Sequence, residues 1–147
     1  MENINLPRND QTAKFANRSL VRAVVFQILY QEELNPGSMD HHSESYLERE
    51  LPRHEPLLRF AKMLLDGTVK ERTKIDELLT SLAKNWSLSR MSPVDRSILR
   101  LASYEIMFTK TPKPVVINEA VELAKTYGAA DSPHFVNGIL DRISCLL

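Results

Sequence analysis

Three basic residues near the start of the chain have the spacing of a phosphate-binding surface. Lys14, Arg18 and Arg22 follow one another at intervals of four residues. In a helix, residues four apart lie on one face, so these three cations, here called the basic column, stand opposite much of a Val and Ile stripe. Such a column can reach successive phosphates of a single strand. Charge spacing alone, however, favours an ordinary solvated face.

A second group of residues lies where the last expected helix begins. Asp131 precedes Ser132-Pro133, and His134 and Phe135 follow. A helix N-terminus presents unpaired N–H groups and a partial positive charge, which suit a phosphate. An exposed Phe135 could stack on an unpaired base, although the same residue could pack in the core. If His134 contacts RNA, affinity should rise between about pH 8 and about pH 6, because imidazole gains charge.

The sequence offers no convincing catalytic or metal-binding group. His41 and His42 are adjacent and would point apart, and His54 is isolated. The carboxylate pair Glu32-Glu33 is expected on a polar face. Cys145, the only cysteine, has apolar neighbours, which favours an inert thiol in a reducing compartment. We therefore expect a protein that binds rather than catalyses, without metal or cofactor.

Composition predicts one soluble domain with no general attraction to nucleic acid. The chain has 147 residues, of which 43% are hydrophobic and 26% charged, as in an ordinary globular protein. Its formal net charge is zero, so RNA binding must come from a local surface or a partner's help. No signal peptide is evident, and no segment approaches the roughly 20 apolar residues of a membrane span. A cytoplasmic location without membrane contact is expected.

The patterns predict an all-α bundle of about seven helices that forms a single domain over residues 10–147, after a flexible tail at 1–9. Apolar residues recur with helical spacing, and no segment alternates convincingly as a strand would. Helices are expected at about 10–33, 43–50, 57–66, 69–84, 92–108, 116–127 and 132–143. Trp86 is expected to pack into the core from a loop.

Particular residues should begin, end or space these helices. Ser92 and Asp95 approximate a capping box. Gly67 should interrupt a helix, and the segment 111–114, which contains two prolines, should be extended. Gly128 is expected to end a helix in a left-handed conformation, and the Ser132 hydroxyl to cap the next one. Gly138 should allow close packing of helices, since a helical glycine otherwise costs about 1 kcal/mol.

The segment from Val116 to Ile143, VINEAVELAKTYGAADSPHFVNGILDRI, resembles the signature of the NusB family of bacterial transcription antitermination factors. That signature reads I-N-E-A-hydrophobic-E-L-A-K and then F-V-N-G-hydrophobic-L-D. The resemblance implies two packed helical subbundles. It also implies binding of boxA, a single-stranded element of nascent RNA, together with NusE, a small-subunit ribosomal protein. The complex would help RNA polymerase read through terminators, notably in ribosomal RNA operons.

The resemblance assigns roles to individual residues. Arg18 and Arg22 correspond to arginines of an RNA-binding first helix, and His134 stands where relatives usually carry Lys or Arg. Tyr30, Asp95 and Asp131 correspond to the RNA or partner surface, although Tyr30 could equally be a core residue and Asp95 a helix cap. Many relatives have R-R-x-A-R-E, but this chain reads R-S-L-V-R-A from Arg18. Fewer phosphate contacts, and so a shallower salt dependence, are therefore expected.

Two alternatives remain at this stage. Some ribosomal RNA cytosine methyltransferases carry a NusB-like N-terminal domain, but such an enzyme would continue into a Rossmann-like domain with a glycine-rich loop and a catalytic cysteine. This chain ends directly after its last expected helix. The other alternative is a purely protein-binding helical module with a solvated basic column. Charge reversal at Arg18 and Arg22 would separate it from an RNA-binding protein, because only RNA binding should collapse.

Overall fold

The computed structural model describes residues 10–83 and 87–147, with the side chains of the first helix described from Asn17 onward. The expected tail at 1–9 and Trp86 lie outside these residues. The described helices are α1 (Asp10–Leu34), α2 (Ser38–Glu50), α3 (Glu55–Lys70), α4 (Arg72–Leu82), the 3-10 helix η1 (Leu88–Arg90), α5 (Pro93–Phe108), α6 (Lys113–Tyr127) and α7 (Ser132–Leu146). This part of the chain contains no strand and no helix long and apolar enough to cross a membrane.

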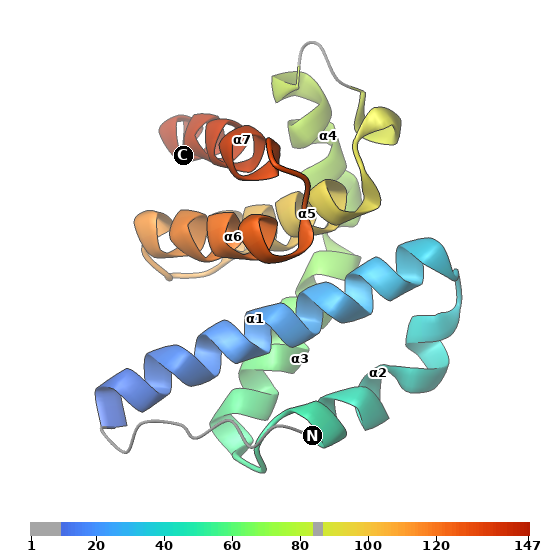
Figure 1. Ribbon diagram of the computed structural model, residues 1–147, viewed down its shortest axis with the longest axis vertical. Coiled ribbons are helices and arrows are strands. Elements are labelled where there is room, and N and C mark those ends of the chain that lie inside the picture. The colour runs from blue at the N-terminus through green and yellow to red at the C-terminus, as the bar shows by residue number, and fades with distance from the viewer. Residues whose placement is uncertain (1–9, 84–86) are drawn as a thin grey trace.

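The seven α-helices form two packed groups, as expected. Figure 1 shows α1, α2 and α3 together in one half of the molecule and α4 to α7 in the other. Both α1 and α3 pack against α5, which joins the two groups. The all-α class and the two-subbundle architecture are thereby confirmed.

Helix α5 is the central helix of the bundle. It contacts α1, α3, α4, α6 and α7. Every residue from 97 to 106 is buried as a result, including the polar Ser97, Arg100, Ser103 and Glu105. Burying a charged side chain is unfavourable unless an opposite charge pairs with it. The carboxylate of Glu105 and the guanidinium of Arg100 therefore need partners from neighbouring helices.

Helix α1 supplies the apolar stripe that the sequence predicts. Val21, Val25 and Phe26 are at most 1% exposed and face the interior. Burying one such side chain contributes roughly 1.5 to 3 kcal/mol, and this stripe docks α1 against both α3 and α5.

Gly67 does not interrupt a helix, contrary to expectation. Helix α3 runs through it to Lys70, and α4 begins at Arg72. A Cβ atom on Gly67 would lie 2.0 Å from Cζ of Tyr104 on α5. The glycine is needed because the Tyr104 ring crosses α3 at this point. Helix α2 also starts earlier than expected, at Ser38.

The proline segment and Gly128 also differ from expectation. Helix α6 begins at Lys113, so Pro114 lies in its first turn, where a missing N–H is tolerated. Gly128 ends α6 at φ −93°, which is not left-handed. A Cβ there would lie 2.6 Å from Cβ of Ser132, so close approach explains this glycine. Gly138, in contrast, is exposed, and a Cβ would meet nothing within 4 Å, so the expected close packing is wrong.

Candidate nucleic-acid interface

Four residues selected from the sequence line one open pocket of about 280 Å³. The pocket lies between the starts of α5 and α7, which pack side by side. Its lining consists of Asp95, Asp131, His134 and Phe135 together with Arg90, Met91 and Ser92. Below, this is called the α5–α7 pocket. The fold thus brings together residues that are about 40 positions apart in the sequence.

Ser92 holds Asp95 at the edge of this pocket. The Ser92 Oγ accepts a hydrogen bond from the Asp95 amide at 3.1 Å, which is one half of the expected capping box. The other half is not formed, since the buried Asp95 Oδ1 has no hydrogen-bond partner among the described residues. Among the described residues, the start of α5 is therefore capped by the Ser92 hydroxyl and not by the Asp95 carboxylate.

The start of α7 is organised differently from the sequence prediction. Ser132 is the first residue of the helix, and its Oγ accepts a hydrogen bond from the Ala129 amide at 3.0 Å. The described structure contains no side-chain cap for α7. The Ser132 hydroxyl therefore orders the preceding loop, and the N-terminal donors of α7 are not taken by a capping side chain.

The side chains of the α5–α7 pocket differ in exposure and charge. Asp131 and His134 are exposed, whereas Phe135 is half-buried and packs against the core. The structure thus shows the core contact of Phe135, and its stacking on a base stays a prediction. The exposed Arg90, which sequence reasoning missed, adds a cation beside two carboxylates. Carboxylates accept hydrogen bonds from base amino groups or ribose hydroxyls, so this mixed lining suits a nucleotide better than an isolated phosphate.

Arg22 does not lie on a solvated face, contrary to the expected basic column. It is 5% exposed, and its Nε and Nη2 donate to the two carboxylate oxygens of Glu105 at 2.8 and 2.6 Å. Its Nη1 lies 3.7 Å from Oε1 of Glu119. The physical reason is that the buried carboxylate on α5 requires a counter-charge, and α1 passes directly against α5.

The structure describes the side chain of Arg18 but not that of Lys14, the other two members of the basic column. Arg18 is half-buried, and its guanidinium carbon lies 4.6 Å from the centre of the Phe60 ring on α3. The backbone at Lys14 belongs to α1, but its side chain lies outside the described part of the structure. Arg18 is therefore the one cation of the column whose described side chain reaches the surface.

Aromatic residues continue along α1 toward the second subbundle. Tyr30 is half-buried and stacks on Phe26, with ring centres 5.9 Å apart. Tyr127, at the end of α6, packs on the same Phe26 ring at 5.0 Å and accepts a hydrogen bond from Gln27. Sequence reasoning did not select Tyr127 as a site residue. It is 40% exposed and lies four residues before Asp131, so it joins α1 to the loop that leads into α7.

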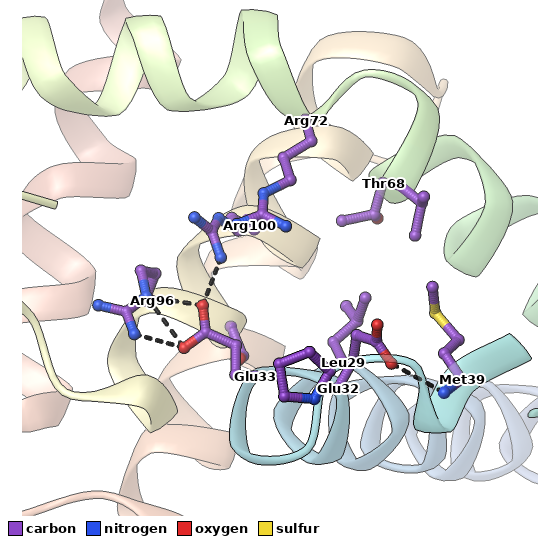
Figure 2. A pocket seen from close by; sticks show the side chains of 11 residues that line it. Leu29, Glu32, Glu33, Met39, Thr68, Arg72, Arg96 and Arg100 are labelled. Carbon is purple, nitrogen blue, oxygen red and sulfur yellow. Dashed lines mark hydrogen bonds and ion pairs between the residues drawn. The ribbon is translucent and has the colours of Figure 1, made fainter. Parts of the chain in front are cut away.

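A network of charges surrounds Glu33, which was expected on a polar face. Figure 2 shows its carboxylate between Arg96 and Arg100, in a pocket of about 370 Å³ bordered by α1, α3 and α5. Arg100 also donates to Asp76 of α4. Burial acts to raise the pKa of Glu33, but hydrogen bonds and charges from Arg96 and Arg100 outweigh it and hold this pKa below its ordinary value. The network ties α1 to α4 and α5.

Glu32 acts on the next helix along the chain. Its carboxylate accepts hydrogen bonds from the Gly37 and Met39 amides at 2.9 and 2.8 Å, the second of which is drawn in Figure 2. These backbone hydrogen bonds lower the pKa of Glu32. The adjacent glutamates are thus structural, and neither is free to serve as a general acid or base.

Comparison with known proteins places this architecture in a family. The chain is 45% identical over 129 residues to the transcription antitermination protein NusB of Desulfitobacterium hafniense, covering 86% of this chain and 87% of the relative. The solved structure of T. maritima NusB is 40% identical, with a TM-score of 0.77, and the match covers 87% of this chain and 90% of that one.

A second solved structure contains the antitermination factors NusB and NusE in complex with double-stranded RNA. Its matching chain is 28% identical with a TM-score of 0.78, and the match covers 90% of this chain and 98% of that one. The family model described as the NusB family matches residues 19–144, which reach into each of the seven α-helices. The chain therefore belongs to the NusB family.

Proposed function

We propose that this protein is a transcription antitermination factor that binds boxA-type single-stranded RNA of nascent transcripts together with NusE. The complex would promote read-through by RNA polymerase, notably in ribosomal RNA operons. In this role the protein acts by binding in the cytoplasm and carries out no chemistry of its own. It contacts the polymerase elongation complex only indirectly, and it requires no metal or cofactor.

The observation that carries this proposal is the convergence of Asp95, Asp131, His134 and Phe135 on one open pocket in a chain of the NusB family. The related NusB and NusE complex with RNA supports both partners. A formal net charge of zero supports the need for NusE, because the protein alone has little long-range attraction for RNA.

Within this function the described residues take different roles. Arg18 would contact a phosphate, Phe135 would stack on a base, and His134, Asp131 and Asp95 would contact the nucleotide or NusE. Tyr30 would lie at the partner surface of α1. Arg22 would act through Glu105 by holding α1 in place, not by touching RNA. Lys14 remains a proposed phosphate contact from the sequence alone.

The first experiment is a titration of labelled boxA-type single-stranded RNA with this protein, with and without NusE, at two salt concentrations. We expect salt-sensitive binding that tightens sharply when NusE is present. Binding of NusE without any RNA binding, alone or in the complex, would contradict the RNA-binding role and leave a protein-binding module.

Variants locate the contact surface in the same assay. Arg18→Glu should lower RNA affinity and reduce the slope of log affinity against log salt by about 0.7, the value for one phosphate of a single strand. Arg49→Glu on α2 is the matched control, because Arg49 also lies over an aromatic ring, Tyr46, outside the proposed surface. Equal losses in both variants would show a nonspecific charge effect.

A further inference from the structure

The Phe60 ring is shared by two guanidinium groups. Phe60 is 9% exposed on α3, and the guanidinium carbons of Arg18 and Arg22 lie 4.6 and 5.4 Å from its ring centre. An aromatic face attracts a cation through its quadrupole, most strongly where water is partly excluded. A residue that the sequence marks only as apolar thus contacts both described members of the basic column.

The two guanidiniums differ in how their N–H groups are used. Arg22 donates to both oxygens of Glu105 and also lies near Glu119, so its donors point into the protein. Arg18 donates no hydrogen bond and forms no ion pair with any other residue among those described. Stacking occupies only the flat face of a guanidinium and leaves the N–H groups at its edge free for a phosphate.

The surrounding charges favour this division of roles. Glu105 and Glu119 offset the charge of Arg22, which reduces the repulsion between two guanidiniums around one ring. The Glu105 pair also fixes Arg22 in place, so it occupies part of the space around the ring. Phe60 holds Arg18 in the rest of the space around its ring, near the surface. Arg18 therefore loses less conformational entropy when a phosphate binds than a freely rotating arginine would.

We propose that Phe60 is a positioning residue for RNA binding, which holds the Arg18 guanidinium so that its free edge meets a phosphate of the single strand. The inference rests on the proposed function, since it assumes that Arg18 contacts RNA. It adds a residue on α3, outside the α5–α7 pocket and outside the first helix, to those that determine RNA affinity.

The test is a double-mutant cycle with Phe60→Leu and Arg18→Ala, measured as affinity for labelled boxA-type single-stranded RNA in the presence of NusE. Leucine keeps the apolar contact of Phe60 but removes the aromatic face. We expect Phe60→Leu to weaken binding about three-fold in the wild-type background and to have no further effect in Arg18→Ala. Phe60→Tyr keeps the aromatic face and should retain the wild-type affinity.

Two further measurements separate positioning from folding. Urea unfolding and NusE affinity are measured for each variant, and RNA affinity is compared only among variants that are folded and bind NusE normally. If Phe60→Leu does not fold, Phe60→Tyr and Phe60→Met replace it, the methionine variant being the one expected to lose affinity. A merely structural role would weaken RNA binding equally with and without Arg18.

The outcomes distinguish the inference from the proposed function. An equal loss for Phe60→Leu in both backgrounds overturns the positioning role. So does an unchanged affinity for Phe60→Leu while Arg18→Ala binds weakly, although Arg18 then remains an RNA contact. If Arg18→Ala binds as wild type, both the positioning role and the Arg18 contact are wrong. If the wild-type complex binds no RNA, the proposed function itself fails.

Discussion

The α5–α7 pocket and the face of α1 contribute to the candidate interface in different ways. In the pocket, Asp131 and His134 are exposed at the start of α7, where the sequence predicts them. On α1, two arginines one turn apart have opposite environments, because Arg18 reaches the surface and Arg22 is buried against Glu105. The helix period alone therefore does not decide which cations of a column are available to a ligand.

The difference arises from the range of the interactions involved. Pocket residues are placed by the start of their own helix, through Pro133 in α7 and the Ser92 cap in α5. Arg22 is placed by a carboxylate 83 residues further along the chain. Removing long-range partners should therefore affect folding, whereas changing exposed residues should affect binding, and the following variants test this contrast.

The largest effect is expected for Glu105→Gln. Removing one partner of a buried ion pair leaves the other charge uncompensated, so the free energy of unfolding should fall by about 3 to 5 kcal/mol. Urea denaturation measures this loss. Glu119→Gln is the control, because its carboxylate lies 3.7 Å from Arg22 and is 25% exposed, and about 1 kcal/mol is expected. Similar small losses in both variants would mean that Arg22 finds water once Glu105 is removed.

Glu33→Gln should have the next largest effect on stability. Arg96 keeps two backbone carbonyl acceptors and Arg100 keeps Asp76, so the loss should be near the lower limit for a broken buried pair, about 3 kcal/mol. Glu122→Gln, at an exposed pair with Lys125, should change stability by less than about 1 kcal/mol. A loss no larger than this control would show that the network around Glu33 is not stabilising.

Glu33 should also make the free energy of unfolding depend on pH. Because the folded-state pKa of Glu33 lies below its ordinary value of 4.5, the unfolded chain takes up protons first as the pH falls. The stabilisation is therefore complete well above pH 4.5 and is lost as the pH decreases through the folded-state value. Unfolding free energies measured from neutral to acidic pH should fall more steeply in the wild type than in Glu33→Gln. Parallel curves would contradict this contribution.

Local sequence signals predicted the helices better than they predicted contacts between helices. The apolar stripe of α1 and the Ser92 cap could be recognised because their determinants lie within a few residues. The prediction that Gly67 interrupts a helix was wrong, because the Tyr104 ring that requires this glycine comes from another helix. The prediction of an extended segment through Pro114 was wrong for a different reason. A proline near a helix start is compatible with both a linker and a first turn, and here it lies in the first turn of α6.

Ser92→Ala tests whether a local signal indeed places the pocket. Loss of the hydrogen bond to the Asp95 amide should reduce the free energy of unfolding by about 1 kcal/mol, as for other N-caps. It should also weaken RNA binding by the NusE complex if Asp95 takes part. Ser92→Asp restores a cap and is the control for folding. A variant with the expected loss of stability but unchanged RNA affinity would remove Asp95 from the interface.

The smallest effect is expected at Gly138, where neither local nor long-range packing explains the residue. Alanine fits there, since a Cβ meets nothing within 4 Å, so Gly138→Ala should raise the free energy of unfolding by about 0.5 to 1 kcal/mol. Gly138 lies one turn after His134, on the exposed side of α7. If RNA or NusE approaches this backbone closely, the same variant should lose affinity while gaining stability, and exposed Asn137→Ala should not. A partner packed against the α7 backbone at Gly138 could not accept the added methyl group. If Gly138→Ala binds RNA and NusE as the wild type does, the contacts made by α7 are therefore confined to its first turn.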